Sequence, residues 1–308
     1  MRGEGKGGGE RPPEMPFLPL TLTLSPKGRG EINLREDAMK LAWINLLPKE
    51  TQSEIGLDFK PVWAGFERYF QRITKARPGT KIQIYFPEKS SWTVHFPYIE
   101  FLNNRWFIEA GWKAEQEGCD AVIVGAATDT GLQYLKEILS IPVVGITESA
   151  CHLACVLGAK FAGITVFRRL IPPKANLIRS YGLESRAIQN PIRSCDLTGE
   201  DIAGLFDKAV MAASIQPKFE AVAKECIKDG AEVIICDDAW LAPALSYFDY
   251  FSVADTGVPV VDASAAAVKL AETLVDLKKM EHLEVSRFLT YQRATDQEME
   301  KARKHYWE

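Results

Sequence analysis

Short apolar runs alternate with amphipathic stretches along most of the chain. Each apolar run is bounded by turn-forming residues and is rich in residues favoured in strands. Nearly continuous apolar strands separated by helices are typical of parallel sheets covered on both faces. The pattern predicts an α/β fold with strands at 41–46, 81–85, 121–125, 142–146, 161–166, 233–236 and 259–262. The helices predicted between them cover 97–117, 131–139, 170–181, 218–228 and 264–277.

An internal repeat indicates two similar lobes. The segment EGCDAVI at 117–123 resembles DGAEVII at 229–235, and each leads through a strand and a helix to a second apolar strand. Position 120 corresponds to 232, and position 141 to 258, which are offsets of 112 and 117 residues. The repeat predicts two Rossmann-like lobes with parallel sheets, related by a pseudo-two-fold axis. Ligands of such sheets bind beyond the carboxyl ends of the strands, so we expect a cleft between the lobes.

These features set the expected domain boundaries. We expect the first lobe at 39–146, joined by C-terminal helices at 263–308, and the second lobe at 147–262. Residues 1–38 are rich in Gly, Pro, Arg and Glu and have no apolar periodicity, whereas KLAWINLL begins directly after Met39. The apolar patch at 17–24 lacks the features of a signal peptide. We therefore expect 1–38 to be a disordered leader or a start-site artefact.

Composition and charge limit the kinds of partner that this protein is expected to bind. The net charge is −4 and there is no long basic run, which argues against nucleic-acid binding. No run approaches the ~20 apolar residues that a membrane span needs. The six cysteines are scattered without a CxxC pair, which is typical of reduced thiols in a cytoplasmic protein. We expect a small-molecule ligand, no metal and no cofactor, and a homo-oligomer is possible.

Several segments, taken in their order and spacing, carry a family resemblance. They are WIN at 43–45, GAATDTGL at 125–132, IPVVGITESA at 141–150, LA at 153–154, FAGITV at 161–166, YGL at 181–183, and Val258 through the AAAVKL stretch at 265–270. Together they resemble the aspartate/glutamate racemase superfamily, and most of all its hydantoin racemase branch. The resemblance covers residues 40–275 and implies the two-lobed fold predicted above.

The resemblance also implies a chemistry. Such racemases remove a proton from the carbon next to a carbonyl and return one on the opposite face. Two thiols do this, one from each lobe, because the pKa of a cysteine can be tuned towards neutrality. Here the first thiol position falls on Ala126 and the second on Asp238, and the repeat offset of 112 residues connects the same two positions. Alanine carries no proton, so the usual two-cysteine mechanism is absent.

Three groups near the second position are catalytic candidates. Asp238 is a possible base if burial raises its pKa, and the neighbouring charge of Asp237 would act in the same direction. Cys236 lies two residues earlier, on the same side of an extended strand, so a slip of the alignment would put a thiol at this position. Alternatively, one of the two acids caps the following helix, whose N-terminus favours a carboxylate.

Candidate substrate contacts lie at the predicted strand ends. Hydroxyl and backbone N–H groups of the TDTG turn are suited to hold a carboxylate or an oxyanion. The alternatives are structural: an N-cap at Thr128 or Asp129, the end of a strand at Asn45, and the start of a helix at 148–149. His95 precedes a predicted helix, where family members place loops over the cleft. The candidates are Asn45, Ala126, Ala127, Thr128, Asp129, Glu148, Ser149 and Thr165.

Three functions follow from these residues. The first is a racemase-like enzyme that moves a proton at a carbon next to the carbonyl of a small carboxylate, amide or cyclic ureide, by a mechanism without the cysteine pair. The second is an arylmalonate decarboxylase-like or other reaction on the same fold, because those enzymes resemble this fold and also have a small residue at the first position. The third is a non-catalytic protein that binds a small ligand. With one proton carrier, exchange without inversion is expected.

Overall fold

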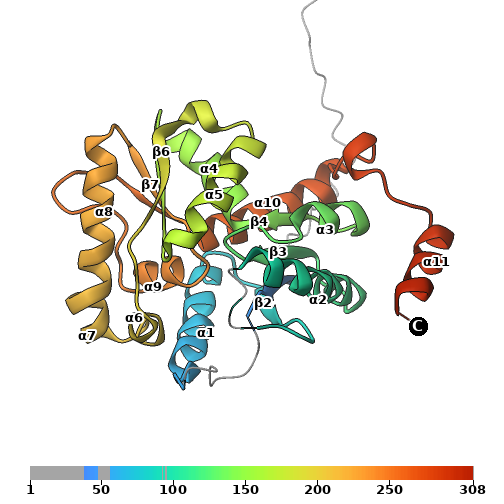
Figure 1. Ribbon diagram of the computed structural model, residues 1–308. Helices are drawn as coiled ribbons and strands as arrows, with labels where there is room; N and C mark the ends of the chain where they lie inside the picture. Colours follow the sequence, from blue (N-terminus) through green and yellow to red (C-terminus); the bar gives the residue numbers. More distant parts are fainter. Residues whose placement is uncertain (1–37, 48–55, 92, 94–95, 308) are drawn as a thin grey trace, which may run out of the picture. The chain divides into compact units, whose positions relative to one another are not determined.

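Two four-stranded parallel sheets form the framework of the protein (Figure 1). The computed structural model describes residues 38–47, 56–91, 93 and 96–307. The first sheet has the order β2-β1-β3-β4, with β1 at Met39–Asn45, β2 at Thr80–Tyr85, β3 at Ala121–Gly125 and β4 at Val143–Gly145. The second has the order β6-β5-β7-β8, with β5 at Phe161–Thr165, β6 at Ala187–Ser194, β7 at Val233–Cys236 and β8 at Val260–Asp262. All of these strands pair in parallel, which confirms the α/β prediction.

The α-helices of the described residues are α1 (Lys60–Thr74), α2 (Pro97–Gln116), α3 (Leu132–Ile138), α4 (Ile146–Leu157), α5 (Ile171–Ser180), α6 (Gly199–Ala203), α7 (Lys208–Val210), α8 (Gln216–Lys228), α9 (Leu241–Tyr247), α10 (Ala263–Glu281) and α11 (Asp296–Trp307). The helices predicted from the sequence are present as α2, α3, α5, α8 and α10. A π-helical segment at Met211–Ile215 joins α7 to α8.

Strand β6 is absent from the sequence prediction, and its residues explain why. Half of its sequence, AIQNPIRS, is polar, and it contains a proline, which a central strand does not tolerate. β6 lies at the edge of the second sheet, where only one side is hydrogen-bonded, and its register with β5 shifts between Phe161 and Gly163. An irregular edge strand has no clear apolar pattern to detect.

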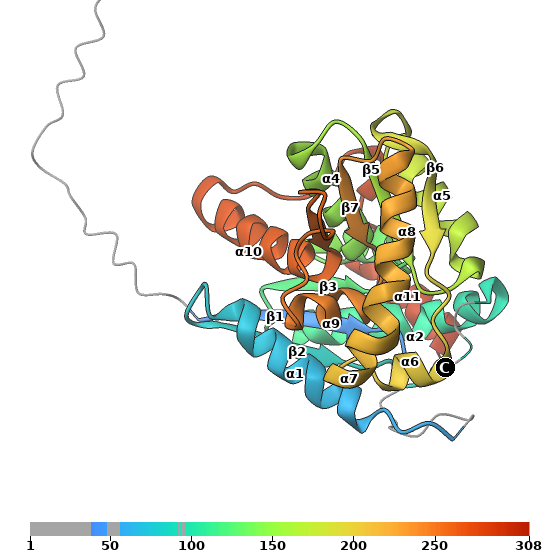
Figure 2. The same ribbon diagram turned by 90° about the vertical axis from the view of Figure 1, so that its left-hand side faces the viewer.

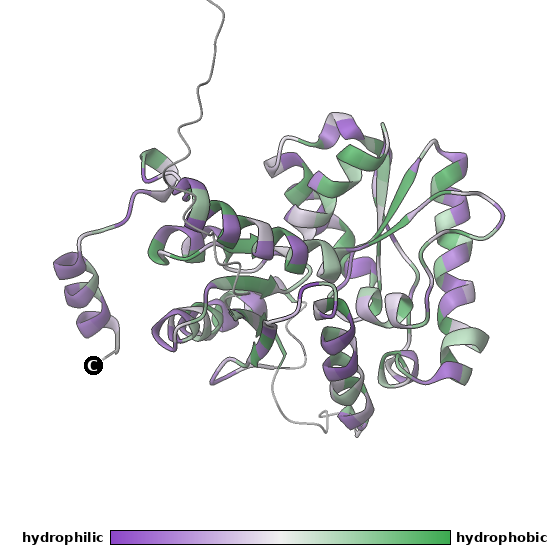
Figure 3. Cartoon of the chain, turned by 180° about the vertical axis from the view of Figure 1, so that it is seen from behind, coloured by the Kyte–Doolittle hydropathy of each residue, from purple (hydrophilic) through white to green (hydrophobic). Residues whose placement is uncertain are grey.

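The two faces of the first sheet belong to different cores. Successive side chains of a strand point to opposite faces. Ile44 and Val124 pack with Phe107 of α2 and Leu135 of α3. Trp43, Ile123 and Val144 instead join the large core that also contains the strands of the second sheet. In Figure 3 the strands are mainly green, as expected for sheets covered on both faces.

Helix α10 returns the chain from the second sheet to the first. It begins directly after β8, and it packs against β1, β3, β4 and α4 (Figure 2). Its buried face consists largely of small residues, among them Ala266, Ala267 and Ala271, which allow close packing on the strands. Both sheets therefore belong to a single compact unit. The lobe boundaries stay a prediction, and the predicted leader lies outside the described residues.

None of the described helices combines the length and the apolar character needed to cross a membrane.

Candidate functional site

A cavity of about 350 Å³ lies beyond the carboxyl ends of strands from both sheets. Asn45 ends β1, Ala126 follows β3, Val166 follows β5 and Asp238 comes two residues after β7, and all four line this cavity. This is the position at which open α/β sheets bind their ligands. The volume lies in the range of small-molecule sites.

Most of the cavity wall is apolar. Phe59 and Trp240 form one side, with their rings in a T-shaped contact at 5.6 Å between centroids. Leu46, Leu47, Leu57, Phe167, Leu170 and Ile202 also line it. Among the described residues, the polar side chains on the wall are few: Asn45, Thr93, Glu100, Thr128 and Asp238. An apolar wall with a few placed polar groups is typical of sites that bind small organic molecules.

Asp238 is placed by the start of α9. Its Oδ1 accepts hydrogen bonds from the backbone N–H groups of Trp240 and Leu241, both at 2.9 Å. Its Oδ2 accepts no hydrogen bond from the described residues. Burial raises the pKa of Asp238 above its usual range, while the two backbone hydrogen bonds act in the opposite direction. Asp238 therefore caps α9 with one oxygen and also lines the cavity.

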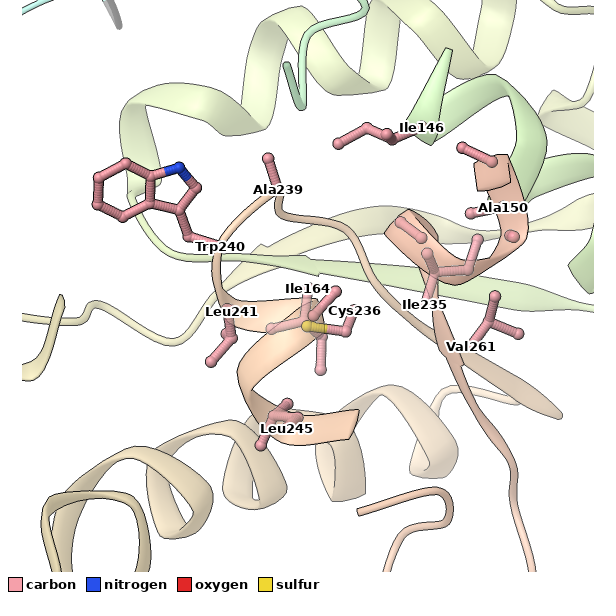
Figure 4. Close-up of a cluster of buried hydrophobic side chains, with 14 of the residues drawn as sticks. Ile146, Ala150, Ile164, Ile235, Cys236, Ala239, Trp240, Leu241, Leu245 and Val261 are labelled. Atoms are coloured by element: carbon pink, nitrogen blue, oxygen red, sulfur yellow. The ribbon is translucent and has the colours of Figure 1, made fainter. Parts of the chain in front are cut away.

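Cys236 lies in the hydrophobic core instead of the cavity. Its side chain is 1% exposed, and Figure 4 shows its sulfur among the side chains of Ile164 and Leu241. Burial raises the pKa of its thiol well above the ordinary value. The structure thus places the Asp238 carboxylate, and not the Cys236 thiol, on the cavity wall. Which group carries a proton stays a prediction.

Asp237 does not line the cavity and forms a buried ion pair. Nζ of Lys174 lies 2.8 Å from Asp237 Oδ2, and the two side chains are 0% and 2% exposed. The hydroxyl of Thr147 donates to Asp237 Oδ1 at 2.6 Å. Lys174 also donates to the carbonyl oxygen of Ala127 at 2.6 Å. These contacts, which we call the buried bridge, connect the end of β7 to the loop after β3.

Asp129 caps a helix, but not the one that the sequence suggested. It adopts a left-handed φ of 46° and accepts hydrogen bonds from the N–H groups of Thr147 at 3.1 Å and Glu148 at 2.8 Å. It therefore caps α4, not the helix that follows it in the chain. Tyr181 donates a third hydrogen bond, at 2.6 Å. Burial raises the pKa of Asp129 to about 7, although these hydrogen bonds lower it.

The remaining predicted contacts fall into two groups. Asn45, Ala126, Ala127 and Thr128 line the cavity, and Asn45 is held by a hydrogen bond from its Nδ2 to Leu47 O at 2.8 Å. Three others do not line it. Glu148 pairs with Lys136 at 2.5 Å, Ser149 donates to Gly145 O at 2.6 Å, and Thr165 is fully buried. His95 lies outside the described residues.

Glu100 is a cavity residue that the sequence analysis missed. It lies in the first turn of α2, is partly buried, and lines the cavity. Its Oε1 accepts hydrogen bonds from the hydroxyls of Thr128 at 2.7 Å and Thr130 at 2.5 Å. In the sequence, an acid in the first turn only indicates a favourable interaction with the helix dipole. Its partners are 28 and 30 residues away, so no local pattern connects them.

No group of three or more His, Cys, Asp or Glu side chains in the described part of the chain is arranged to hold a metal ion.

Comparison with known proteins connects this geometry to a family. Residues 100–271 match the family model described as Asp/Glu/hydantoin racemase. A hydantoin racemase of Pseudomonas sp. (strain NS671) is 32% identical over 207 residues, which cover 66% of this chain and 78% of that protein.

Solved structures agree with this match. An allantoin racemase from Pseudomonas fluorescens is 25% identical, with a TM-score of 0.66, and the match covers 83% of this chain and 97% of that one. An allantoin racemase from Klebsiella pneumoniae has the same TM-score at 22% identity, and covers 84% of this chain and 94% of its own. At that identity the second likeness concerns the fold, and it supports the two-lobed arrangement of the two sheets.

Proposed function

This chain belongs to the Asp/Glu/hydantoin racemase family, and we propose that it moves a proton at a carbon next to a carbonyl, with Asp238 as a proton carrier. The substrate class is a small carboxylate, amide or cyclic ureide. The observation that carries the proposal is the position of Asp238 on the cavity wall, beyond the end of β7. Ala126 lines the same cavity beyond the end of β3 and has no proton to transfer.

The surroundings of Asp238 suit this task. A general base works best when its pKa is near the working pH, and burial raises the pKa of this carboxyl group towards that range. The hydrogen bonds to Oδ1 fix the carboxylate, so that Oδ2 is held in one direction. The apolar wall strengthens the electrostatic interactions of a bound substrate, because charges attract each other more strongly in apolar surroundings than in water. The hydantoin and allantoin racemases among the relatives favour a cyclic ureide as the substrate. The apolar cavity wall favours a ureide with an apolar substituent.

A decarboxylase-like reaction is the second candidate. It needs a proton donor on one side only, and the small Ala126 is compatible with that arrangement. The apolar wall also favours loss of a charged carboxylate, because the wall solvates that group poorly.

Solvent exchange tests the proposal. The protein is incubated in heavy water with each enantiomer of 5-isobutylhydantoin, aspartate and glutamate, and with allantoin, and proton NMR follows the hydrogen on the α-carbon. Deuterium should replace that hydrogen faster than in samples without protein. A phenyl-substituted malonate in the same series detects the decarboxylase-like reaction. If no probe gains deuterium or loses carbon dioxide, the proposal is wrong and a non-catalytic binding function takes its place.

A further inference from the structure

The first sheet contributes its own carboxyl group to the cavity, although the residue after β3 is Ala126. Glu100 extends from α2, which packs on β1 and β3, and lines the cavity together with Thr128. Asp238 reaches the same cavity from the second sheet. The cavity therefore has one carboxyl group from each half of the structure, as a reaction that works on both faces of a carbon requires.

The hydrogen bonds around Glu100 fix its position at the cavity. Its Oε1 and the two hydroxyl oxygens of Thr128 and Thr130 form a triangle with edges of 2.7, 2.5 and 2.7 Å. Oε1 accepts hydrogen bonds from both hydroxyls. Glu100 is therefore held at the cavity by the loop after β3.

Asp238 is held in a similar way. Its Oδ1 accepts hydrogen bonds from two backbone N–H groups. Each half of the cavity thus presents one carboxyl group that is fixed through a single oxygen. A protonated acid and an ionised base in the same cavity are the starting state that a two-base transfer needs.

We propose that Glu100 is the second proton carrier and takes the place of the thiol that Ala126 cannot supply. This inference rests on the proposed function. Asp238 Oδ2 removes the proton from the substrate carbon, and the electron pair of the C–H bond moves towards the neighbouring carbonyl to give an enolate. The enolate then takes the proton of Glu100 on its other face, so the product is inverted. Asp238 ends protonated and Glu100 ionised, and this state accepts the opposite enantiomer.

The arrangement changes the expected outcome of solvent exchange. One carrier alone gives exchange with retention, whereas two carriers give exchange together with inversion. Thr130 does not line the cavity, and it serves as a positioning residue that holds Glu100.

Paired variants test the proposal with 5-isobutylhydantoin in heavy water, followed by NMR and circular dichroism. The wild type should invert both enantiomers. Glu100→Gln keeps the shape and should lower inversion by about 10²-fold or more, while the enantiomer that Asp238 deprotonates still exchanges with retention. Asp238→Asn should also lower inversion, but the enantiomer that Glu100 deprotonates should still exchange with retention. Thr130→Val should lower inversion less than Glu100→Gln.

Glu109→Gln is the matched control, because Glu109 lies on the same helix and pairs with Arg303. It should invert at the wild-type rate, and thermal melts of all variants check that they fold. Exchange in the wild type without inversion would overturn the inference and leave the proposed function standing. The inference would also be overturned if Glu100→Gln inverted the substrate at the wild-type rate, or if it lost exchange of both enantiomers equally. No exchange in the wild type would refute the proposed function itself.

Discussion

The loops after β3 and β7 occupy equivalent positions in the two halves but use their acids differently. After β7, Asp238 caps its own helix and also lines the cavity. After β3, the equivalent position is Ala126, and the nearby acid, Asp129, is turned away to cap α4. In the loop after β7 a single acid both caps a helix and lines the cavity, whereas in the loop after β3 the acid only caps a helix. The first half then depends on Glu100, from a different element, for a carboxyl group.

The two loops are also joined directly by the buried bridge. Lys174 contacts Asp237 in one loop and the Ala127 carbonyl in the other, with Thr147 between them. The geometry of each half of the cavity therefore depends on the other.

Breaking the buried bridge should have the largest effect on stability. Lys174→Met leaves the carboxylate of Asp237 buried without its cation, which should lower the free energy of unfolding by about 3–5 kcal/mol. Urea denaturation measures the loss. Lys228→Met is the control, because Lys228 pairs with Glu225 on the surface and its loss should change stability by less than about 1 kcal/mol. Equal denaturation midpoints for Lys174→Met and the wild type would show that the loops are not coupled through this ion pair.

The acid on the cavity wall should matter most for activity. Asp238→Asn keeps a hydrogen-bond acceptor for α9 but cannot carry the proton, so activity should fall by about 10²-fold or more. Cys236→Ser should have a much smaller effect, and iodoacetamide should inactivate slowly or not at all, because the thiol is buried. Steady-state kinetics compares the two variants. The reverse result would mean that the chemistry resides two residues earlier, and the decarboxylase-like candidate would then take first place.

Asp129 should give the first loop a pH-dependent stability. Its pKa rises from 3.8 to about 7 on folding, because the carboxyl group is buried. The folded state then binds the proton more tightly than the unfolded state, so this contribution is fully present below pH 3.8 and is lost as pH rises through about 7. The slope reaches about 1.4 kcal/mol per pH unit.

The variant Asp129→Asn isolates this contribution. Asparagine tolerates the left-handed φ of this position and still offers an oxygen to cap α4. Melting temperatures between pH 4.5 and 7.5 should fall less steeply in the variant than in the wild type. Asp238 and Asp262 are also buried with raised pKa values, so the difference between the two proteins is the informative quantity. Parallel curves would exclude Asp129 as the source.

The sequence predicted the sheets better than the polar contacts between them. Strands β3 and β7 were placed at their observed ends, because continuous apolar runs are local signals and the repeat fixes their register. Asp238 could be identified as a candidate from the sequence because it follows the end of β7 in a register that the repeat defines. The partners of Asp129, Asp237 and Glu100 could not, because each is met only after folding brings distant segments together. Tyr181, for example, is 52 residues from Asp129.

Helix α10 reverses the usual relation between synthesis and folding. Domains generally fold in the order in which the ribosome releases them, N-terminal first. Here part of the face of the first sheet that carries Ile123 and Val144 is covered by a helix made after every strand of the second sheet. The packing of the first strands is therefore completed only at the end of translation. A nascent chain that stalls before Ala263 leaves the part of this apolar face under α10 uncovered and open to chaperones and to aggregation, even though both sheets have already been translated.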